Sequence, residues 1–187
     1  MLDIGSYITI NISCPNAFGG QPFTDKKSLE YLLSALSQFP KIKPIFIKLS
    51  PDLSEQELDG IIAISEKYNI DGFISSNLTK NRDNPKIKNA VPTVGGMSGK
   101  VVEDLSNKMI RHLYKKTTGK KIIIGCGGVF SADDAYEKIK AGASLIQMIT
   151  GMIFEGPQII SEINLGLVKL LEHDGFKNIS EAIGTEN

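Results

Sequence analysis

Short apolar segments alternate along this chain with longer segments of helical periodicity, and this alternation constrains the fold more than any other feature. Residues 7–13 show the strand pattern most clearly, because Ile8, Ile10 and Ile12 fall on one face and polar residues fall on the other. Four further segments have a similar length and apolar character. The predicted strands are therefore residues 7–13, 44–49, 72–76, 121–125 and 143–149.

Helical segments lie between and after these strands and carry recognisable end signals. Ser54 followed by Glu57 forms a capping box, Ser131 with Asp134 resembles a second N-cap, and Gly175 ends the last long helix. Apolar residues three and four positions apart define the faces expected to be buried. These stripes comprise Leu29, Leu32, Leu33 and Leu36; Leu58, Ile61 and Ile62; Leu105, Met109, Ile110 and Leu113; and Ile160, Ile163, Leu167, Leu170 and Leu171.

Strands that alternate with helices form right-handed βαβ units around a parallel sheet, which predicts an α/β fold. An open doubly wound sheet and a TIM (β/α)8 barrel both satisfy this alternation. Polar or glycine residues stand at the C-terminal end of each predicted strand, as Lys48, Asn77 and Gln147 illustrate, and no G-x-G-x-x-G motif follows the first strand. This distribution favours the TIM barrel, which places its chemistry on that rim.

A complete TIM barrel has eight strands and typically about 250 residues, whereas this chain has 187 residues and about five βα units. We therefore expect a single domain, residues 1–187, that forms an N-terminally truncated portion of a barrel without its first three strands. Five units leave two open sheet edges. A homodimer or a complementing N-terminal half is accordingly an expected partner.

Composition excludes several classes of protein. The 21 basic and 21 acidic side chains give zero net charge, and no basic run exceeds two residues, so nucleic acid is not an expected partner. No apolar stretch reaches the length of about 18–20 residues that a membrane span needs, and no export signal is recognisable. We expect a cytoplasmic chain with reduced cysteines. No cluster has metal-ligand spacing, and His112 and His173 are expected on solvated helix surfaces.

The segment Asn11-Ile12-Ser13-Cys14-Pro15-Asn16 is the most informative for chemistry. Two amides can read the carboxylate and imide edges of a small planar acid, because amides both donate and accept hydrogen bonds. A thiol can serve as a base when its surroundings favour the thiolate. Taken alone, Cys14 fits a buried cysteine beside a turn made by Pro15 and Asn16 better than it fits a catalytic base.

This segment resembles the active-site signature of the dihydroorotate dehydrogenase family, and the resemblance continues through most of the chain. A lysine follows on the next strand in Ile47-Lys48-Leu49-Ser50-Pro51-Asp52, and an asparagine ends the strand after it in Ser75-Ser76-Asn77-Leu78-Thr79. A glycine loop follows at residues 95–100, and a phosphate loop follows at Gly125-Cys126-Gly127-Gly128-Val129. The motifs are weak one by one and specific in this order.

The resemblance implies an FMN-dependent enzyme that oxidises dihydroorotate to orotate in pyrimidine (UMP) biosynthesis. It implies that Cys14 is the catalytic base and that the substrate is bound by Asn11, Asn16, Asn77 and Leu78. It implies that FMN is bound by Asn11, Lys48, Ser76, Gly99, Gly127, Gly128, Ile149 and Thr150. Strand alternation predicts that Lys48 faces the barrel interior, where it stabilises the reduced flavin or, alternatively, forms an interior salt bridge.

The family has two classes, and this sequence combines features of both. A cysteine base is typical of the soluble class, whereas residues 95–100 and 125–184 resemble the quinone-linked class more closely. Quinone is therefore the favoured electron acceptor, with NAD or fumarate as alternatives, and the full-length form is expected at the inner face of a membrane. Two other functional readings stay open: a dihydropyrimidine dehydrogenase-like FMN barrel, and an inert fragment or half of a split enzyme.

Overall fold

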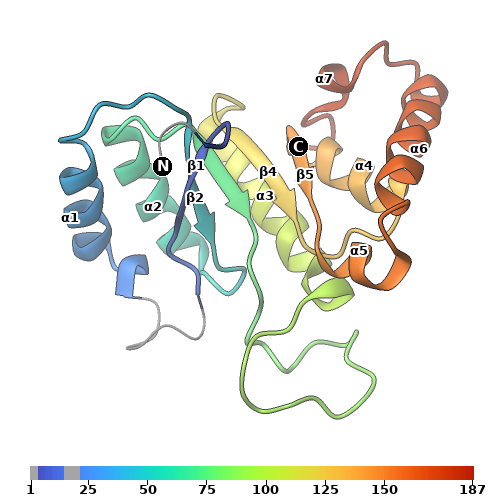
Figure 1. Cartoon of the computed structure of the whole chain (residues 1–187), viewed down its shortest axis with the longest axis horizontal. Coiled ribbons are helices and arrows are strands. Elements are labelled where there is room, and N and C mark those ends of the chain that lie inside the picture. Colours follow the sequence, from blue (N-terminus) through green and yellow to red (C-terminus); the bar gives the residue numbers. More distant parts are fainter. Residues whose placement is uncertain (1–3, 15–21) are drawn as a thin grey trace.

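Five parallel strands form one sheet in the computed structural model, which describes residues 4–14 and 22–187 (Figure 1). Their order in space is the order in the sequence, β1-β2-β3-β4-β5. The strands are β1 (Ile8–Asn11), β2 (Ile45–Leu49), β3 (Gly72–Ser75), β4 (Ile122–Cys126) and β5 (Leu145–Gln147). All five strands predicted from the sequence are confirmed. β1 and β5 are shorter than predicted at both ends.

The predicted helices are also confirmed, together with their end signals. The Ser54 side chain accepts a hydrogen bond from the Glu57 backbone, and the Glu57 side chain accepts one from the Ser54 backbone. Ser131 caps the backbone N–H of Asp134, and Gly175 adopts a left-handed conformation at the end of its helix. The long helices are α1 (Lys26–Leu36), α2 (Glu55–Lys67), α3 (Glu103–Thr117), α4 (Ala132–Lys140) and α6 (Ile159–Asp174).

Four short elements have no counterpart among the predictions. They are η1 (Pro22–Thr24), η2 (Gly99–Val102), α5 (Thr150–Glu155) and α7 (Ile179–Ala182). Each has six residues or fewer, which is too short to display a helical hydrophobic period. Two of them border the rim of the sheet, where η2 follows the long loop after β3 and α5 follows β5 (Figure 1).

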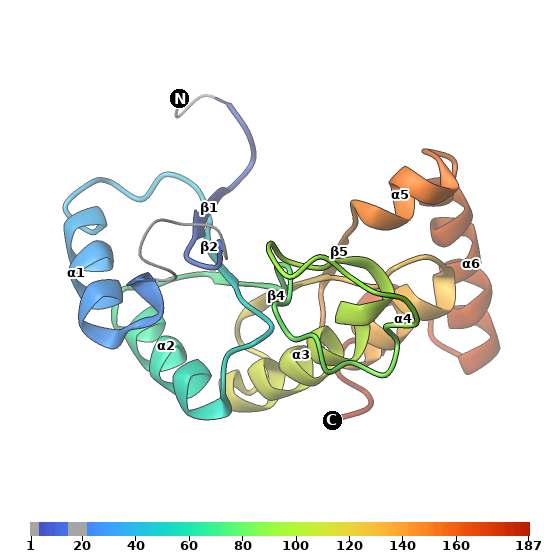
Figure 2. The ribbon, with the colours of Figure 1, turned by 90° about the horizontal axis from the view of Figure 1, so that it is seen from below.

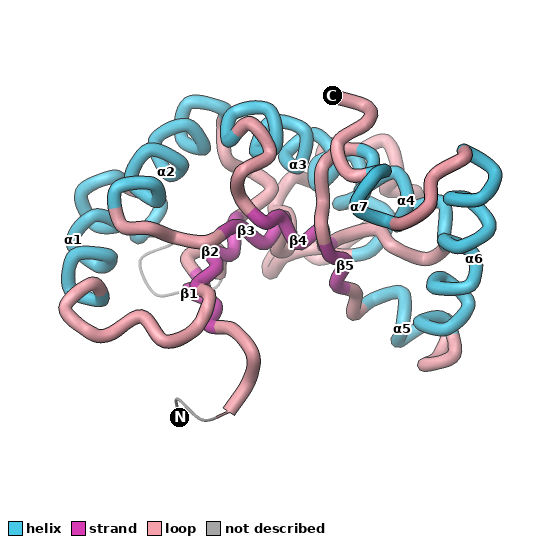
Figure 3. Tube along the Cα trace, turned by 90° about the horizontal axis from the view of Figure 1, so that it is seen from above, coloured by secondary structure: helices cyan, strands magenta, loops and turns pink. Residues whose placement is uncertain are grey.

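The helices α1 to α4 line one side of the sheet, and the strands curve away from them as an arc (Figures 2 and 3). The main core fills the space between these two layers. Ile47, Phe73 and Ile123 are fully buried on the helix-facing side of the sheet and belong to the same cluster as Ile61 and Leu113 from the helices. Burial of such side chains drives the two layers together.

The concave side of the arc has its own smaller apolar layer, formed by Phe46, Ile74 and Ile124. The Tyr7 ring contacts the Phe46 ring edge-on, with 5.2 Å between ring centroids. Gln147 Nε2 donates a 2.7 Å hydrogen bond to the Tyr7 hydroxyl, so side chains beside the two outermost strands meet across the concave side. Such curvature, together with sequential strand order, is that of a TIM barrel portion. A doubly wound sheet reverses its strand order at a switch point.

Two further sequence expectations have different outcomes. His173 is exposed as predicted, but the prediction for His112 was wrong, because only 13% of its side chain is exposed and its Nε2 lies 2.7 Å from Asp59 Oδ1. The carboxylate on α2 draws the imidazole of α3 into the groove between these helices. None of the helices in the described part of the chain is both long and apolar enough to cross a membrane.

Candidate functional site

A cavity of about 130 Å³ opens on the rim, where β2, β3, β4 and β5 end. Nine residues predicted from the sequence to bind substrate or cofactor line this cavity: Lys48, Ser76, Asn77, Leu78, Gly99, Gly127, Gly128, Ile149 and Thr150. They come from segments up to a hundred residues apart. The sheet therefore brings the predicted set together in space.

A second cavity of about 500 Å³ continues along β5 and shares Lys48, Cys126, Met148 and Ile149 with the first. The shared residues make the two cavities one extended site. A cavity of about 580 Å³ lies elsewhere, lined by residues of α2, α3 and neighbouring loops, and none of the predicted site residues lines it. We assign the candidate site to the rim, because polar side chains from four strands converge there.

Ser13 connects the predicted catalytic segment to the rest of the rim. Its backbone N–H and its hydroxyl both donate to Asn11 Oδ1, at 3.2 and 2.8 Å. Its carbonyl accepts a 2.8 Å hydrogen bond from Asn77 Nδ2, across 64 positions of sequence. Cys14 follows immediately and is exposed. Ser13 thus holds the side-chain amides of Asn11 and Asn77 next to the segment that carries Cys14.

Lys48 lies on the concave face of β2, as strand alternation predicts. It is opposite Asn11 of β1 and Ile74 of β3 in the parallel register. The alternative of an interior salt bridge finds no support in residues 4–14 and 22–187, where no carboxylate lies within ion-pair distance of Lys48. The half-buried ammonium group lines both rim cavities and is available to a ligand.

Cys126 forms the floor between the two cavities. Burial raises the pKa of its thiol, and the nearby charges of Lys48 and Lys138 oppose that rise only in part. The thiol therefore favours its neutral form at physiological pH. Its backbone carbonyl accepts hydrogen bonds from Ser76 N at 2.7 Å and from Ser106 Oγ at 2.9 Å, so Cys126 has a structural role.

Three glycines on the rim have backbone conformations that other residues rarely adopt. The φ angles are +82° at Gly99, +118° at Gly127 and +76° at Gly128. A side chain at Gly128 would clash with Glu103, whose Cβ lies 2.4 Å from the position of an added Cβ. Bare backbone of this kind lets N–H groups approach a phosphate closely. The neighbouring Thr150 donates a 2.9 Å hydrogen bond to the Ser98 hydroxyl, so polar groups and bare backbone lie together at this end of the cavity.

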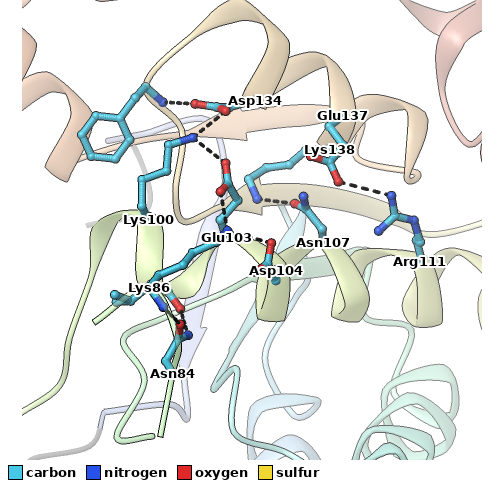
Figure 4. A network of polar contacts seen from close by, with 12 residues as sticks. Asn84, Lys86, Lys100, Glu103, Asp104, Asn107, Arg111, Asp134, Glu137 and Lys138 are labelled. Carbon is cyan, nitrogen blue, oxygen red and sulfur yellow. Dashed lines mark hydrogen bonds and ion pairs between the residues drawn. The ribbon is translucent and has the colours of Figure 1, made fainter. Parts of the chain in front are cut away.

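Ion pairs hold the rim loops in place (Figure 4). Lys100 contacts both Glu103 and Asp134 at 2.6 Å, which joins η2 to the start of α3 and to the start of α4. Asp134 also accepts a 2.8 Å hydrogen bond from the backbone N–H of Phe130 in the glycine loop. The pKa of Asp134 is lowered below its ordinary value, because its hydrogen bonds to Lys100 and Phe130 outweigh the opposing effect of burial. The network stabilises both walls of the smaller cavity.

The predicted residues and the residues found at the site do not coincide completely. Asn16, predicted to bind substrate, lies outside the residues that the structure describes. Sequence reasoning missed the linking role of Ser13 and several residues that line the cavity, namely Ser98, Val102, Phe130, Met148 and Gly151. Their positions beside predicted residues were the available signal. Met148 and Gly151 directly flank Ile149 and Thr150, and Ser98 precedes Gly99.

Comparison with known proteins gives a consistent result. The family model described as dihydroorotate dehydrogenase matches residues 1–171. A dihydroorotate dehydrogenase (quinone) of Nostoc punctiforme is 42% identical, over 98% of this chain and 51% of its own length. The mitochondrial dihydroorotate dehydrogenase (quinone) of Arabidopsis thaliana is 42% identical over 97% of this chain and 41% of its own. The crystal structure of the ligand-free DHODH from Eimeria tenella superposes on this chain with a TM-score of 0.89 at 29% sequence identity. The superposition covers 97% of this chain and 56% of the Eimeria tenella chain. The chain thus spans about half the length of these relatives.

Proposed function

The chain belongs to the dihydroorotate dehydrogenase family, and on this basis we propose that the protein oxidises dihydroorotate to orotate with FMN as its cofactor. The observation that carries the proposal is the convergence of nine predicted ligand-binding residues on one rim cavity, beside the segment that holds Cys14. The names of the relatives favour dihydroorotate over the substrate of a dihydropyrimidine dehydrogenase.

Substrate binding follows from the two amides that Ser13 positions. The hydrogen bonds with Ser13 use Oδ1 of Asn11 and Nδ2 of Asn77. Among the described residues, Nδ2 of Asn11 and Oδ1 of Asn77 are then left for a ligand. One donor and one acceptor suit a planar ring that carries both a carboxylate and an imide. Asn16 and Leu78 complete the proposed substrate contacts.

Cys14 acts as the general base in this proposal. Its thiolate removes the proton from C5 of dihydroorotate, and the C5–C6 bond becomes a double bond as a hydride leaves C6. FMN, when bound, accepts that hydride. Lys48 offers a positive charge beside the place where negative charge develops, and Ser76, Ile149 and Thr150 line the same cavity. The glycine loops hold the cofactor's phosphate.

Quinone is the proposed electron acceptor, because the relatives with about 40% identity carry quinone in their names. A quinone-linked enzyme must meet an apolar acceptor, so we place the whole protein at the periphery of a membrane. Reoxidation assays with a short-chain ubiquinone, NAD⁺ and fumarate separate the alternatives. Faster turnover with NAD⁺ or fumarate than with quinone would contradict this assignment.

Additional strands must complete the rim for turnover. Apolar side chains are exposed on the outermost strands, with Ile8 at 38% and Leu145 at 55% exposure. Open edges of this kind recruit further strands. We propose that these come from further residues of the same polypeptide, from a complementing half or from a second copy. Mixing this chain with the N-terminal half of a relative, followed by size-exclusion chromatography, tests the complementing-half arrangement.

The test of the reaction is a pair of variants at Cys14, made in the protein completed by its additional strands. Cys14→Ala should slow flavin reduction by dihydroorotate by at least about 10²-fold, because a positioned general base contributes that much. FMN affinity should be unchanged. Cys14→Ser is the matched comparison, because its hydroxyl can still accept the proton, and it should reduce flavin faster than Cys14→Ala. Equal rates for both variants would refute the role of Cys14.

A further inference from the structure

A lysine on α4 is buried directly behind the phosphate loop. Lys138 has no solvent exposure, and its Nζ donates a 2.5 Å hydrogen bond to Oδ1 of Asn107, which is itself 2% exposed (Figure 4). Asn107 is neutral. Within the described residues no carboxylate lies at ion-pair distance from Lys138. A buried charge without a counterion is costly, so its retention needs an explanation.

The position of Lys138 ties it to the glycine loop. Its Cδ lies 3.2 Å from where a Cβ of Gly125 would stand, two residues before Gly127. On α3, Asn107 is next to Ser106. The Cβ of Ser106 lies 3.6 Å from where a Cβ of Gly127 would stand. The Lys138 side chain therefore packs between α3 and the end of β4, next to the residues that lead into the loop, and it does not line either rim cavity.

The other charged side chains around the loop give an anion no net attraction. The ion-pair cluster at the rim contains Lys86, Lys100, Glu103, Asp104 and Asp134, that is, two cations and three anions with a net charge of −1. This cluster borders the loop directly, because Glu103 contacts Gly128 and Asp134 bonds Phe130 N. Lys48, which lines the same cavity, brings this sum to zero, so the buried lysine gives a bound phosphate a net positive surrounding.

We propose that Lys138 is a positioning residue that strengthens phosphate binding at the Gly127–Gly128 loop through its buried positive charge, without touching the phosphate. This inference rests on the proposed FMN site. The charge acts through the protein interior, where Coulomb interactions are stronger and less screened by salt than at the surface. Burial lowers the pKa of Lys138 to about 8, against the opposing influence of Glu103, Glu137, Cys126 and Asp134, so the cation persists at pH 7.

The test compares FMN with riboflavin, which has the same ring system and no phosphate. Flavin fluorescence titrations at pH 7.0 are made on the protein completed by its additional strands. Lys138→Met should weaken the binding of FMN about tenfold, the effect of one nearby charge, and should weaken the binding of riboflavin less than twofold. Lys138→Arg keeps the charge and should keep the preference for FMN. Lys140→Met is the matched control, because it removes a positive charge from the same helix. Lys140 pairs with Glu186 away from the loop, so this variant should change neither the FMN affinity nor the riboflavin affinity.

A second measurement uses the unmodified protein, so it does not depend on the folding of a variant. Between pH 7.0 and 9.5 its FMN affinity should fall towards that of Lys138→Met, whose own affinity should stay flat over this range. Equal losses for FMN and riboflavin in Lys138→Met, or no loss for FMN, would overturn the inference and leave the FMN site standing. Failure of the protein to bind either flavin once its additional strands complete the barrel would overturn the proposed function and this inference with it.

Discussion

The buried lysine also predicts how the stability of the protein depends on pH. Burial lowers the pKa of Lys138 from 10.5 to about 8 in the folded protein. Between these two values the unfolded chain holds a proton that the folded chain has released, so the free energy of unfolding rises with pH. With these two pKa values, the rise between pH 7.5 and 9.5 amounts to about 2 kcal/mol.

Lys138→Met removes this rise. Loss of the hydrogen bond to Asn107 shifts the variant's stability by an amount that does not depend on pH, so the difference in slope isolates the charge. The acidic residues near Lys138 are present in both the parent protein and Lys138→Met, so their titration affects both pH profiles. Cys126 titrates in the opposite sense, because its pKa is raised in the folded state, and a Cys126→Ala background removes that contribution from the comparison.

Urea unfolding followed by far-ultraviolet circular dichroism at five pH values gives the two slopes. We expect the free energy of unfolding of the parent protein to gain about 2 kcal/mol relative to Lys138→Met between pH 7.5 and 9.5. Parallel pH profiles would show that the ammonium group is solvated or paired in solution, and would refute the reasoning. A fall relative to the variant would show that Lys138 is stabilised by its surroundings as a cation.

Further predictions concern the site, the fold and the assembly. Cys14→Ser should retain activity with its pH optimum moved upward, because a hydroxyl ionises less readily than a thiol; an unmoved optimum in steady-state assays would argue against proton removal at this position. Gly128→Ala should weaken FMN binding at least tenfold in fluorescence titrations, since the new Cβ would meet Glu103 and the positive φ is strained. Ser54→Ala should lower the free energy of unfolding by about 1 kcal/mol in urea titrations through loss of the capping box. The isolated 187-residue chain should self-associate and retain FMN poorly, as measured by light scattering and flavin absorbance; a stable, active monomer would contradict the proposal that further strands are required.

Local patterns in the sequence were sufficient to identify the main elements of the fold. Strand alternation placed Ile8 and Ile10 on the helix-facing side of β1, and it placed Lys48 on the concave side of β2. The Ser54–Glu57 capping box and the Gly175 stop signal marked helix ends correctly. These features depend on contacts between residues a few positions apart, which is why a single sequence reveals them. Motif order then indicated the family and most of the residues around the rim cavity.

Only the tertiary structure decided which distant residues meet. The bond between Ser13 and Asn77 spans 64 positions, and the bond between Tyr7 and Gln147 spans 140, so no local pattern could indicate either. Lys138 shows the same limit in another form. On α4 its sequence neighbours suggest an ordinary surface lysine, whereas the close packing of α4 against α3 and the end of β4 removes it from solvent. Curvature of the sheet and packing between layers set these environments, and both arise from contacts summed over the whole chain.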